Sequence, residues 1–173
     1  AMTRHSAETC SEFDLSVYKR VSLIGIGKGS ALASVALAKI LGKKLTGGIA
    51  LDVNKLQTTN YKLQTLAGTH PLPSKQNIAA TQKIIKIVKN LKKDDLLIAF
   101  ICGGGSALLC GSEKEMKNSI LATKLLTQAG ANILELNTAR KHFSQVKGGG
   151  LAKLAYPATV ISLIVSDVPT TNN

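Results

Sequence analysis

Hydrophobic residues fall into short continuous runs, and the segments between these runs carry apolar residues at helical spacing. Residues 20–26, 48–53, 95–101 and 158–165 have the length and composition of buried strands. Residues 31–41 show the apolar spacing of a helix. Continuous hydrophobic strands that alternate with helices are typical of a largely parallel sheet. The pattern therefore predicts an α/β three-layer sandwich with helices on both faces of the sheet.

Capping residues mark the starts of two further helices. Ser74 follows the turn His70-Pro71-Leu72-Pro73 and is expected to cap the helix that comes next. Ser112, with Glu115 three residues later, forms a capping-box pattern that opens another helix. Both segments lie between predicted strands, as the sandwich requires.

Two stretches have weaker patterns. Residues 54–63 are polar without a clear period, and we expect a loop there. Residues 133–136 are expected to form a short strand. Asn137 or Thr138 is then the N-cap of a helical segment that Gly148-Gly149-Gly150 interrupts.

The length and composition of the chain limit its class. With 173 residues, of which 45% are hydrophobic, we expect a single domain over residues 1–173. Residues 1–11 are polar, lack the apolar core of a signal peptide and are expected to be disordered. The apolar runs are far shorter than the roughly 20 residues of a membrane helix. With three scattered cysteines, the composition predicts a reduced, cytoplasmic protein with no membrane partner.

The net charge of +12 raises the question of a polyanionic partner. The lysines, however, are spread along helix faces, as at Lys83, Lys86 and Lys89, and aromatic residues make up only 3% of the chain. No basic segment is interleaved with aromatic residues that would stack on bases. We therefore expect a solvated helix face and no nucleic-acid partner, and a polyanion-binding patch is the alternative.

A glycine-rich loop follows the first predicted strand. The sequence Gly25-Ile26-Gly27-Lys28-Gly29-Ser30 lacks the spacing of a Walker A loop and the third glycine of a dinucleotide fingerprint. A lysine in such a loop, between the carboxyl end of a strand and the start of a helix, nevertheless suits a phosphoryl group. Gly27 and Lys28 are therefore candidate phosphate-binding residues. A tight turn with an exposed lysine is the alternative.

A second glycine loop, Gly103-Gly104-Gly105-Ser106, closely follows the buried strand at residues 95–101. Three consecutive glycines permit positive φ angles and close approach of the main chain. Their amide groups can converge on an anion beside the Ser106 hydroxyl. A phosphate or a carboxylate is the predicted occupant, and an ordinary flexible loop is the alternative.

Polar residues in the last third of the chain are further candidates. Asn137, Arg140 and Lys141 bring together an amide, a guanidinium and an ammonium group, and arginine can hold a phosphate or carboxylate with two hydrogen bonds. A solvated basic helix end is the alternative. Asp167 follows the last strand, where its carboxylate suits a magnesium ion or a hydroxyl group, unless it only ends the strand. His70 is expected to be a turn residue without a catalytic role.

In their order, these motifs resemble those of the N-terminal domain of the type II glycerate 2-kinases, whose second half is called the MOFRL domain. The resemblance spans nearly the whole chain and rests on Glu12–Ser16, Gly25–Lys28, Gly68–Pro73, Asp94–Leu97, Cys102–Leu109, Glu135–His142 and Ser166–Pro169. It implies a Rossmann-like N-terminal domain that shares a cleft with a C-terminal domain.

The resemblance also implies an activity: transfer of the γ-phosphoryl group of ATP to the 2-hydroxyl of D-glycerate, with Mg²⁺, to give 2-phosphoglycerate. The family's active-site lysine falls on Lys28, where a positive charge beside the transferred group is what phosphoryl transfer mainly needs. By the same resemblance, the loop Gly103–Ser106 holds phosphate or the substrate carboxylate, and Arg140 and Lys141 bind anionic oxygens. Asp167 would lie near the metal or the hydroxyl group.

The chain also departs from the family pattern. Pro169 stands where a Gly-Asp pair and then a long second domain are usual, and Gly29 stands where alanine is usual. We therefore expect an N-terminal domain without the MOFRL domain, with little or no activity alone. An anion-binding or interaction module without catalysis on the same scaffold is the alternative. An apolar surface meant for a second domain would also favour a homodimer.

Overall fold

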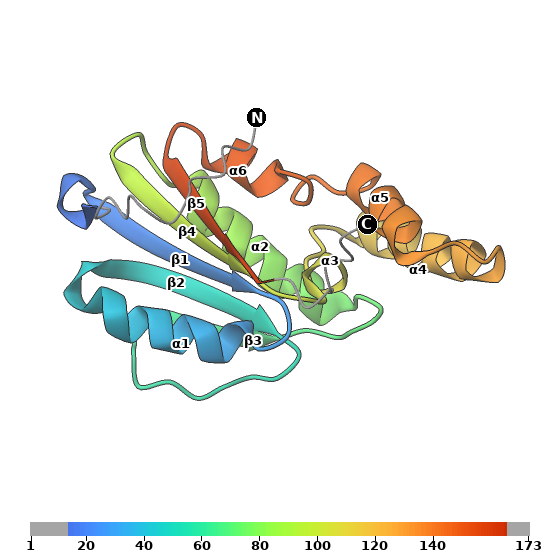
Figure 1. The fold of residues 1–173 in the computed structure, drawn as a ribbon, viewed down its shortest axis with the longest axis horizontal. Helices are drawn as coiled ribbons and strands as arrows, with labels where there is room; N and C mark the ends of the chain where they lie inside the picture. The colour runs from blue at the N-terminus through green and yellow to red at the C-terminus, as the bar shows by residue number, and fades with distance from the viewer. Residues whose placement is uncertain (1–13, 166–173) are drawn as a thin grey trace, which may run out of the picture.

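The computed structural model describes residues 14–165. Within them, five parallel strands form one sheet in the order β3-β2-β1-β4-β5. The strands are β1 (Arg20–Ile26), β2 (Leu45–Asp52), β3 (Leu63–Ala67), β4 (Asp95–Ile101) and β5 (Thr159–Ile164). From β1 the chain adds β2 and β3 on one side, and then returns to add β4 and β5 on the other (Figure 1). The order therefore reverses between β1 and β4, and ligands in such sheets bind at the carboxyl ends of the strands at this point.

Helices cover both faces of the sheet (Figure 1). α1 (Ser30–Leu41) packs mainly against β1 and β2, whereas α2 (Lys75–Lys89) and α6 (Gly150–Ala155) pack together on the other face. α4 (Glu113–Gln128) and α5 (Ile133–His142) pack against each other and project beyond one end of the sheet (Figure 1). The remaining helical segments are η1 (Leu15–Val17), η2 (Gly42–Lys44) and α3 (Gly105–Leu108).

Alternation along the central strand divides its side chains between two cores. Val21 and Leu23 are buried on the face covered by α1, whereas Ile24 and Ile26 are buried on the face covered by α2 and α6. Because both faces of β1 are covered, the strand contains apolar residues at successive positions instead of every second one. This burial on two sides is why the sequence pattern predicted the central strands well.

The predicted α/β sandwich with a parallel sheet is confirmed, and the strands predicted at residues 20–26 and 95–101 match β1 and β4. Ser74 and Ser112 cap α2 and α4 as predicted. β3 was not predicted, because its five residues follow a polar excursion and occupy the edge of the sheet. The expected loop at residues 54–63 is correct except that β3 begins at its last residue.

The short strand predicted at residues 133–136 is wrong, because these residues form the first turn of α5. The N-cap is Asn132 instead of Asn137 or Thr138. Its Oδ1 accepts hydrogen bonds from two amides of the first turn, including that of Glu135 at 3.1 Å. The Glu135 carboxylate accepts from the Asn132 amide in return (2.8 Å). This capping box fixes a helix start where the apolar residues alone indicated a strand.

Some expectations concern the two ends of the chain. Residues 1–11, expected to be disordered, and Asp167, expected to bind magnesium, lie outside the described residues. Across residues 14–165, no helix combines the length and the apolar character needed to cross a membrane.

A buried aspartate joins β1 to the start of β4. The Asp95 side chain is 2% exposed and pairs with Arg20, whose Nε donates to Oδ1 at 3.0 Å. The backbone amide of Lys92 also donates to Oδ2 (2.6 Å). The hydrogen bond from Arg20, followed by that from Lys92, holds the pKa of Asp95 below its usual range despite burial. Its neighbour Asp94 pairs with Lys19 at the exposed surface (2.9 Å).

These two adjacent aspartates allow a matched test of stability. We expect Asp95→Asn to lower the free energy of unfolding by about 2 kcal/mol at pH 7, because it disrupts a buried, charge-assisted network. Asp94→Asn should change it little, since exposed ion pairs contribute little. A carboxylate whose pKa is lowered in the folded state stabilises the folded protein at pH values above its pKa in the unfolded chain. This stabilisation is lost as the pH falls through the pKa of the folded state. Urea unfolding at pH 7 and pH 3 should therefore show the Asp95→Asn difference shrinking in acid, and equal effects of the two substitutions would contradict this account.

Candidate functional site

The loops that follow β1 and β4 touch each other at the carboxyl edge of the sheet. The amide of Cys102 donates to the carbonyl of Ile26 (2.8 Å), and the amide of Lys28 donates to the carbonyl of Gly103 (2.9 Å). Gly27 has a φ of 120°, and a Cβ there would lie 2.5 Å from the carbonyl oxygen of Cys102. Only glycine allows this approach. The two glycine loops predicted from the sequence therefore form one continuous surface at the switch point of the sheet.

The protein itself supplies acceptors for most backbone amides around the first of these loops. The Asp52 carboxylate, at the end of β2, accepts a hydrogen bond from the amide of Ala31 in the first turn of α1 (3.0 Å). The amide of Gly27 donates to the carbonyl of Leu51 (3.1 Å), and the amide of Ser30 donates to Gly27 (3.1 Å). Gly27 therefore packs the two loops together, and its predicted role in phosphate binding stays a prediction. The group that this loop presents to a ligand is the exposed side chain of Lys28.

Lys28 meets His70 above the second glycine loop. Gly104 has a φ of 78°, and a Cβ there would lie 3.1 Å from Cδ2 and Nε2 of His70 and 3.3 Å from Cε of Lys28. Both side chains thus pack over the space that the missing side chain of Gly104 leaves. Among the described residues, no hydrogen-bond acceptor contacts the amides of Gly103 and Gly104. Two amides, an ammonium and an imidazole therefore lie together, although the sequence predicted His70 to be only a turn residue.

Asn77 fixes the turn that carries His70. It is fully buried in α2, and its Oδ1 accepts from the amides of Thr69 and Ser74 (2.9 Å each). Its Nδ2 donates to the carbonyl of Thr69 (3.0 Å) and to that of Leu108 at the end of α3 (2.9 Å). One amide group therefore ties the His70 turn both to α2 and to the segment that follows the glycine loop. The sequence contained no signal for this role beyond an asparagine in the first turn of a capped helix.

The charges around His70 are positive. Burial lowers the pKa of the His70 imidazole below its usual range, and the charges of Lys28 and then Arg140 lower it further. The folded protein therefore favours the neutral imidazole, in which one ring nitrogen keeps a free electron pair.

Arg140 is a buried cation that has no acidic partner among residues 14–165. The residue is 6% exposed, its Nη2 donates to Oγ1 of Thr123 (3.2 Å), and its Nε finds no hydrogen-bond partner in the described part of the chain. The ion pairs found among residues 14–165 involve other residues. Burial alone lowers the pKa of this guanidinium. A charge desolvated in this way without compensation costs stability unless an anion neutralises it.

The other predicted binding residues lie on a neighbouring cavity of about 740 Å³. Ser106, Asn137 and Lys141 line it together with Gly105, and its floor is formed by apolar side chains of β4, β5 and α6. The Oδ1 of Asn137 is buried and has no hydrogen-bond partner within the range 14–165 that the structure describes. Arg140 does not line this cavity, although it lies on the same helix. The predicted residues thus lie in two adjoining parts of the site, one around Lys28 and Gly104 and the other in this cavity. The second glycine loop belongs to both parts.

A buried ion pair supports the wall of this cavity. The side chains of Lys147 and Glu115 are 7% and 3% exposed and form a salt bridge. Glu115 also accepts from the amide of Gly111 (2.8 Å), so it links α4 to the segment after α3 and to the loop before α6. The predicted capping box at Ser112 is therefore only half formed, because Glu115 turns to these partners instead of the Ser112 amide.

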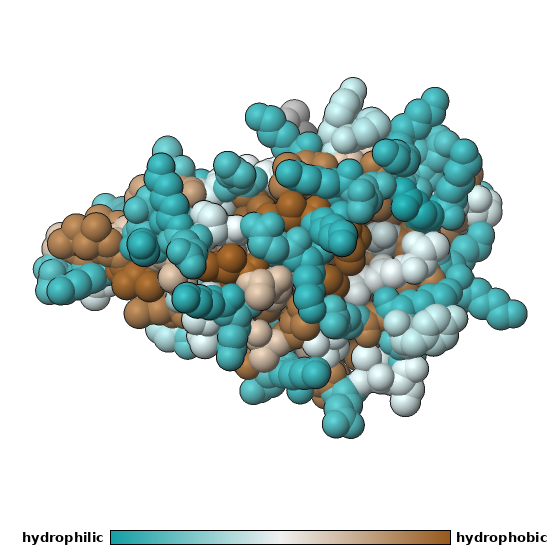
Figure 2. Space-filling view, turned by 180° about the vertical axis from the view of Figure 1, so that it is seen from behind, coloured by the Kyte–Doolittle hydropathy of each residue, from teal (hydrophilic) through white to brown (hydrophobic). Residues whose placement is uncertain are grey.

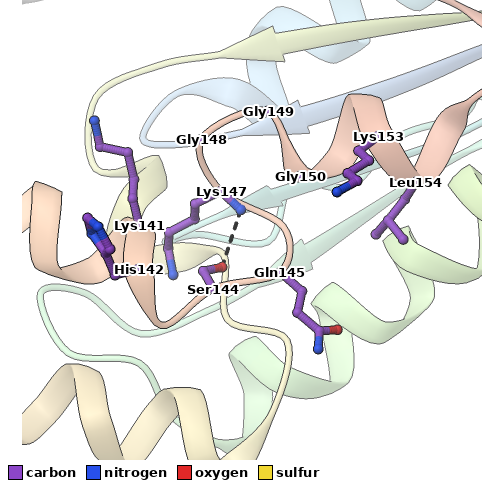
Figure 3. Close-up of a pocket in the computed structure, with 10 residues that line it drawn as sticks. All are labelled: Lys141, His142, Ser144, Gln145, Lys147, Gly148, Gly149, Gly150, Lys153 and Leu154. Carbon is purple, nitrogen blue, oxygen red and sulfur yellow. Dashed lines mark hydrogen bonds between the residues drawn. The ribbon is translucent and has the colours of Figure 1, made fainter.

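A second hollow, of about 710 Å³, adjoins this cavity and shares Lys141, Lys147, Gly148 and Gly149 with it. Figure 3 shows the residues that line it. Lys141 and His142 border it from α5, the loop Gly148–Gly150 forms its rim, and Lys153 and Leu154 border it from α6 (Figure 3). The amide of Lys147 donates to Oγ of Ser144 (3.2 Å), which shapes the loop. Because Lys147 is already paired with Glu115, the lysines that this hollow still offers, Lys141 and Lys153, are surface side chains, and we assign no ligand to it.

The described residues do not form a metal site by themselves. Across residues 14–165, no three side chains of His, Cys, Asp or Glu gather closely enough to hold a metal ion. The acidic residue closest in position to the first loop, Asp52, is engaged with α1 and with its own strand end (Val53 amide, 2.6 Å). The expected ligand Asp167 lies outside the described residues.

A family model described as a domain of unknown function, DUF4147, matches residues 1–172. The chain belongs to the DUF4147 family. One relative of this DUF4147 chain, the glycerate kinase of Rattus norvegicus, is 40% identical over 162 residues, which cover 84% of the chain and 31% of the relative. The D-glycerate 2-kinase of Thermotoga maritima is 35% identical over 154 residues, covering 86% of the chain and 36% of the relative.

A solved structure shares the fold of this chain, and one relative carries the name of a different enzyme. The crystal structure of a glycerate kinase from Thermotoga maritima superposes with a TM-score of 0.77 at 31% identity, covering 88% of the DUF4147 chain and 38% of that protein. A protein of Agrobacterium vitis, provisionally named a hydroxypyruvate reductase, is 37% identical over 152 residues, which cover 87% of the chain and 40% of that protein. The chain therefore spans roughly a third of the length of the relatives it matches, and it resembles the glycerate kinases in sequence and fold.

The unpaired guanidinium of Arg140 gives a test of the site that needs no enzyme assay. We expect Arg140→Met to raise the free energy of unfolding by about 1 kcal/mol in phosphate-free buffer, because an apolar side chain of similar length removes a buried, uncompensated charge. Inorganic phosphate should stabilise the wild-type protein more than this variant. Lys141→Met, which removes the adjacent but exposed cation, is the control and should leave the unfolding free energy unchanged. Urea unfolding with and without phosphate checks this, and a variant less stable than wild type in phosphate-free buffer would refute it.

Proposed function

We propose that this chain is the N-terminal domain of a glycerate 2-kinase, which transfers the γ-phosphoryl group of ATP to the 2-hydroxyl of D-glycerate. The observation that carries the proposal is the contact of Lys28 with the Gly103–Gly105 loop at the switch point of the sheet. An ammonium group and two amides without acceptors can neutralise and orient a phosphoryl group there. The glycerate kinases among the relatives of the chain support the choice of substrates.

The proposed roles follow from the two adjoining places of the site. Lys28 contacts the transferred phosphoryl group, and the buried charge of Arg140 favours an anionic ligand nearby. Ser106, Asn137 and Lys141 bind polar groups of ATP or glycerate from the rim of the 740 Å³ cavity. Its apolar floor suits a nonpolar part of the nucleotide.

Magnesium enters this proposal with the nucleotide. The described residues contain no cluster that would hold the ion alone, so we propose that the phosphates of ATP supply most of its ligands and that Asp167 supplies a further one. Magnesium would neutralise charge on the phosphates of the bound nucleotide. A cytoplasmic location, where ATP is available, is part of the same proposal.

An exposed apolar surface supports a second domain as part of the working enzyme. Leu121, Leu125, Ile133 and Leu134, on α4 and α5, are each more than half exposed. Figure 2 shows apolar side chains gathered over the end of the molecule where these helices project. Apolar patches of this kind commonly mark an interface. We propose that a C-terminal domain packs here and completes the cleft, and that the chain dimerises only in its absence.

The relative named as a reductase suggests another reaction of a three-carbon hydroxy acid. Dinucleotide-binding folds place the pyrophosphate of NAD at the start of the helix that follows the first strand. In this chain the Asp52 carboxylate occupies that helix start and would repel a pyrophosphate. Phosphoryl transfer is therefore the activity that we favour, and a binding module without catalysis is the alternative.

The test measures transfer of labelled phosphate from ATP to D-glycerate, with the second domain of a glycerate kinase supplied. Oxidation of NADH in the presence of hydroxypyruvate is measured in parallel. We expect phosphoryl transfer, and we expect Lys28→Met to lower kcat/KM by about 100-fold or more, because a charge-stabilising contact is lost. Lys39→Met removes an exposed lysine near the other end of α1, away from the glycine loops, and should leave kcat/KM unchanged. Binding of ATP without any turnover would support the non-catalytic module, and oxidation of NADH would support the reductase.

A further inference from the structure

The turn that carries His70 has no role in the phosphoryl transfer proposed above. The side chain packs against Gly104 on the same spot as Lys28, so any group bound by Lys28 and the glycine loop lies within reach of the imidazole. His70 is only half buried, which leaves part of the ring open to a ligand. Its position is determined by the protein and not by the ligand, since the turn is held through Asn77.

The surroundings of His70 set its protonation state. The charged groups that act on it are Lys28, from the loop after β1, and Arg140, from α5, and both are cations. The α2 residue beneath the turn, Asn77, is neutral, and the glycine loop contributes only backbone. A second proton on the ring would add a positive charge next to two others. The neutral ring therefore persists at pH 7 and can accept a proton.

We propose that His70 is a catalytic residue that accepts the proton of the substrate hydroxyl during phosphoryl transfer. The inference rests on the proposed function and names the base for it. The O–H bond of the 2-hydroxyl breaks as its proton passes to the free ring nitrogen, and the oxygen forms a bond to the γ-phosphorus. The bond between this phosphorus and the oxygen of ADP breaks, and ADP keeps the electron pair.

The same surroundings return His70 to its starting state. The imidazolium formed by the transfer lies beside Lys28 and Arg140, which disfavour it, so the proton passes on to water after the reaction. Lys28 then has two effects, because it neutralises the phosphoryl group and adds to the burial that lowers the pKa of the base. Asn77 is a positioning residue in this scheme, since it contacts the turn and not the substrate.

The first arm of the test measures steady-state kinetics with the second domain supplied. His70→Gln keeps a polar side chain but cannot take up the proton, and kcat should fall by about 100-fold while KM changes little. The fall of kcat/KM in acid, which reports the base in the wild-type enzyme, should be absent in the variant. His142→Gln, on α5, is the matched control and should keep both the rate and the pH profile.

Two further variants separate chemistry from folding. His70→Ala should regain activity when free imidazole is added, which a purely structural role would not allow. Asn77→Ala should lower kcat but keep the acid limb of the pH profile, because the base is misplaced and not removed. A His70→Gln variant with the wild-type kcat and acid limb would overturn the proposal and leave the kinase function standing.

The second arm does not depend on turnover. Nitrogen NMR of the labelled chain should show the His70 ring titrating below the range of a free histidine and shifting when D-glycerate and a non-hydrolysable ATP analogue are added. A ring signal that is unchanged at saturating D-glycerate would overturn the contact with substrate, even if the enzyme is active. A wild-type enzyme that binds D-glycerate but transfers no phosphoryl group would overturn the proposed function and this inference together.

Discussion

The site depends on a contact between two loops that leaves no room for a side chain. Gly27 lies against the carbonyl of Cys102, so the loops after β1 and β4 meet backbone to backbone. This contact is what brings Lys28 over Gly104, and the empty space at Gly104 is what lets Lys28 and His70 share one spot. Glycine at these two positions is required by geometry and not by flexibility, because both have positive φ angles and close neighbours.

Positive charge at this edge of the sheet is not neutralised by the described residues around it. The acidic residues that are buried have other partners: Asp95 pairs with Arg20, Glu115 pairs with Lys147, and Asp52 binds the start of α1. Among residues 14–165, Arg140 has a hydroxyl as its hydrogen-bond partner, and burial together with two cations lowers the pKa of His70. Functional sites commonly keep such unfavourable arrangements because a ligand compensates for them.

The sequence indicated the layers of the fold better than the details of the site. Strands buried on both faces are predictable from hydrophobic runs, and Ser74 and Ser112 are recognisable caps. The edge strand β3 depended on its pairing with β2, which the local pattern does not contain. The start of α5 had a local signal, the capping box of Asn132 and Glu135, but the apolar residues after it were interpreted as a strand.

In the site, the contact of Lys28 with the second glycine loop could be anticipated, since the carboxyl ends of adjacent parallel strands meet at one edge of a sheet. The role of Asn77 could not, because its partners are 8 and 31 residues away in the chain. For the same reason His70 looked like an ordinary turn residue. Its two charged neighbours come from segments that only the folded chain brings together.

The Asp52 carboxylate has a consequence for how the first loop meets a ligand. Asp52 holds the start of α1, and the amides of Gly27 and Lys28 already have backbone acceptors, so this loop needs no ligand to hold its shape. Little conformational entropy remains to be lost there when a ligand binds, so the binding free energy is not spent on ordering the main chain. What remains adjustable is the flexible stem of Lys28. A rigid frame that carries one movable charge can follow a phosphoryl group as it travels from donor to acceptor.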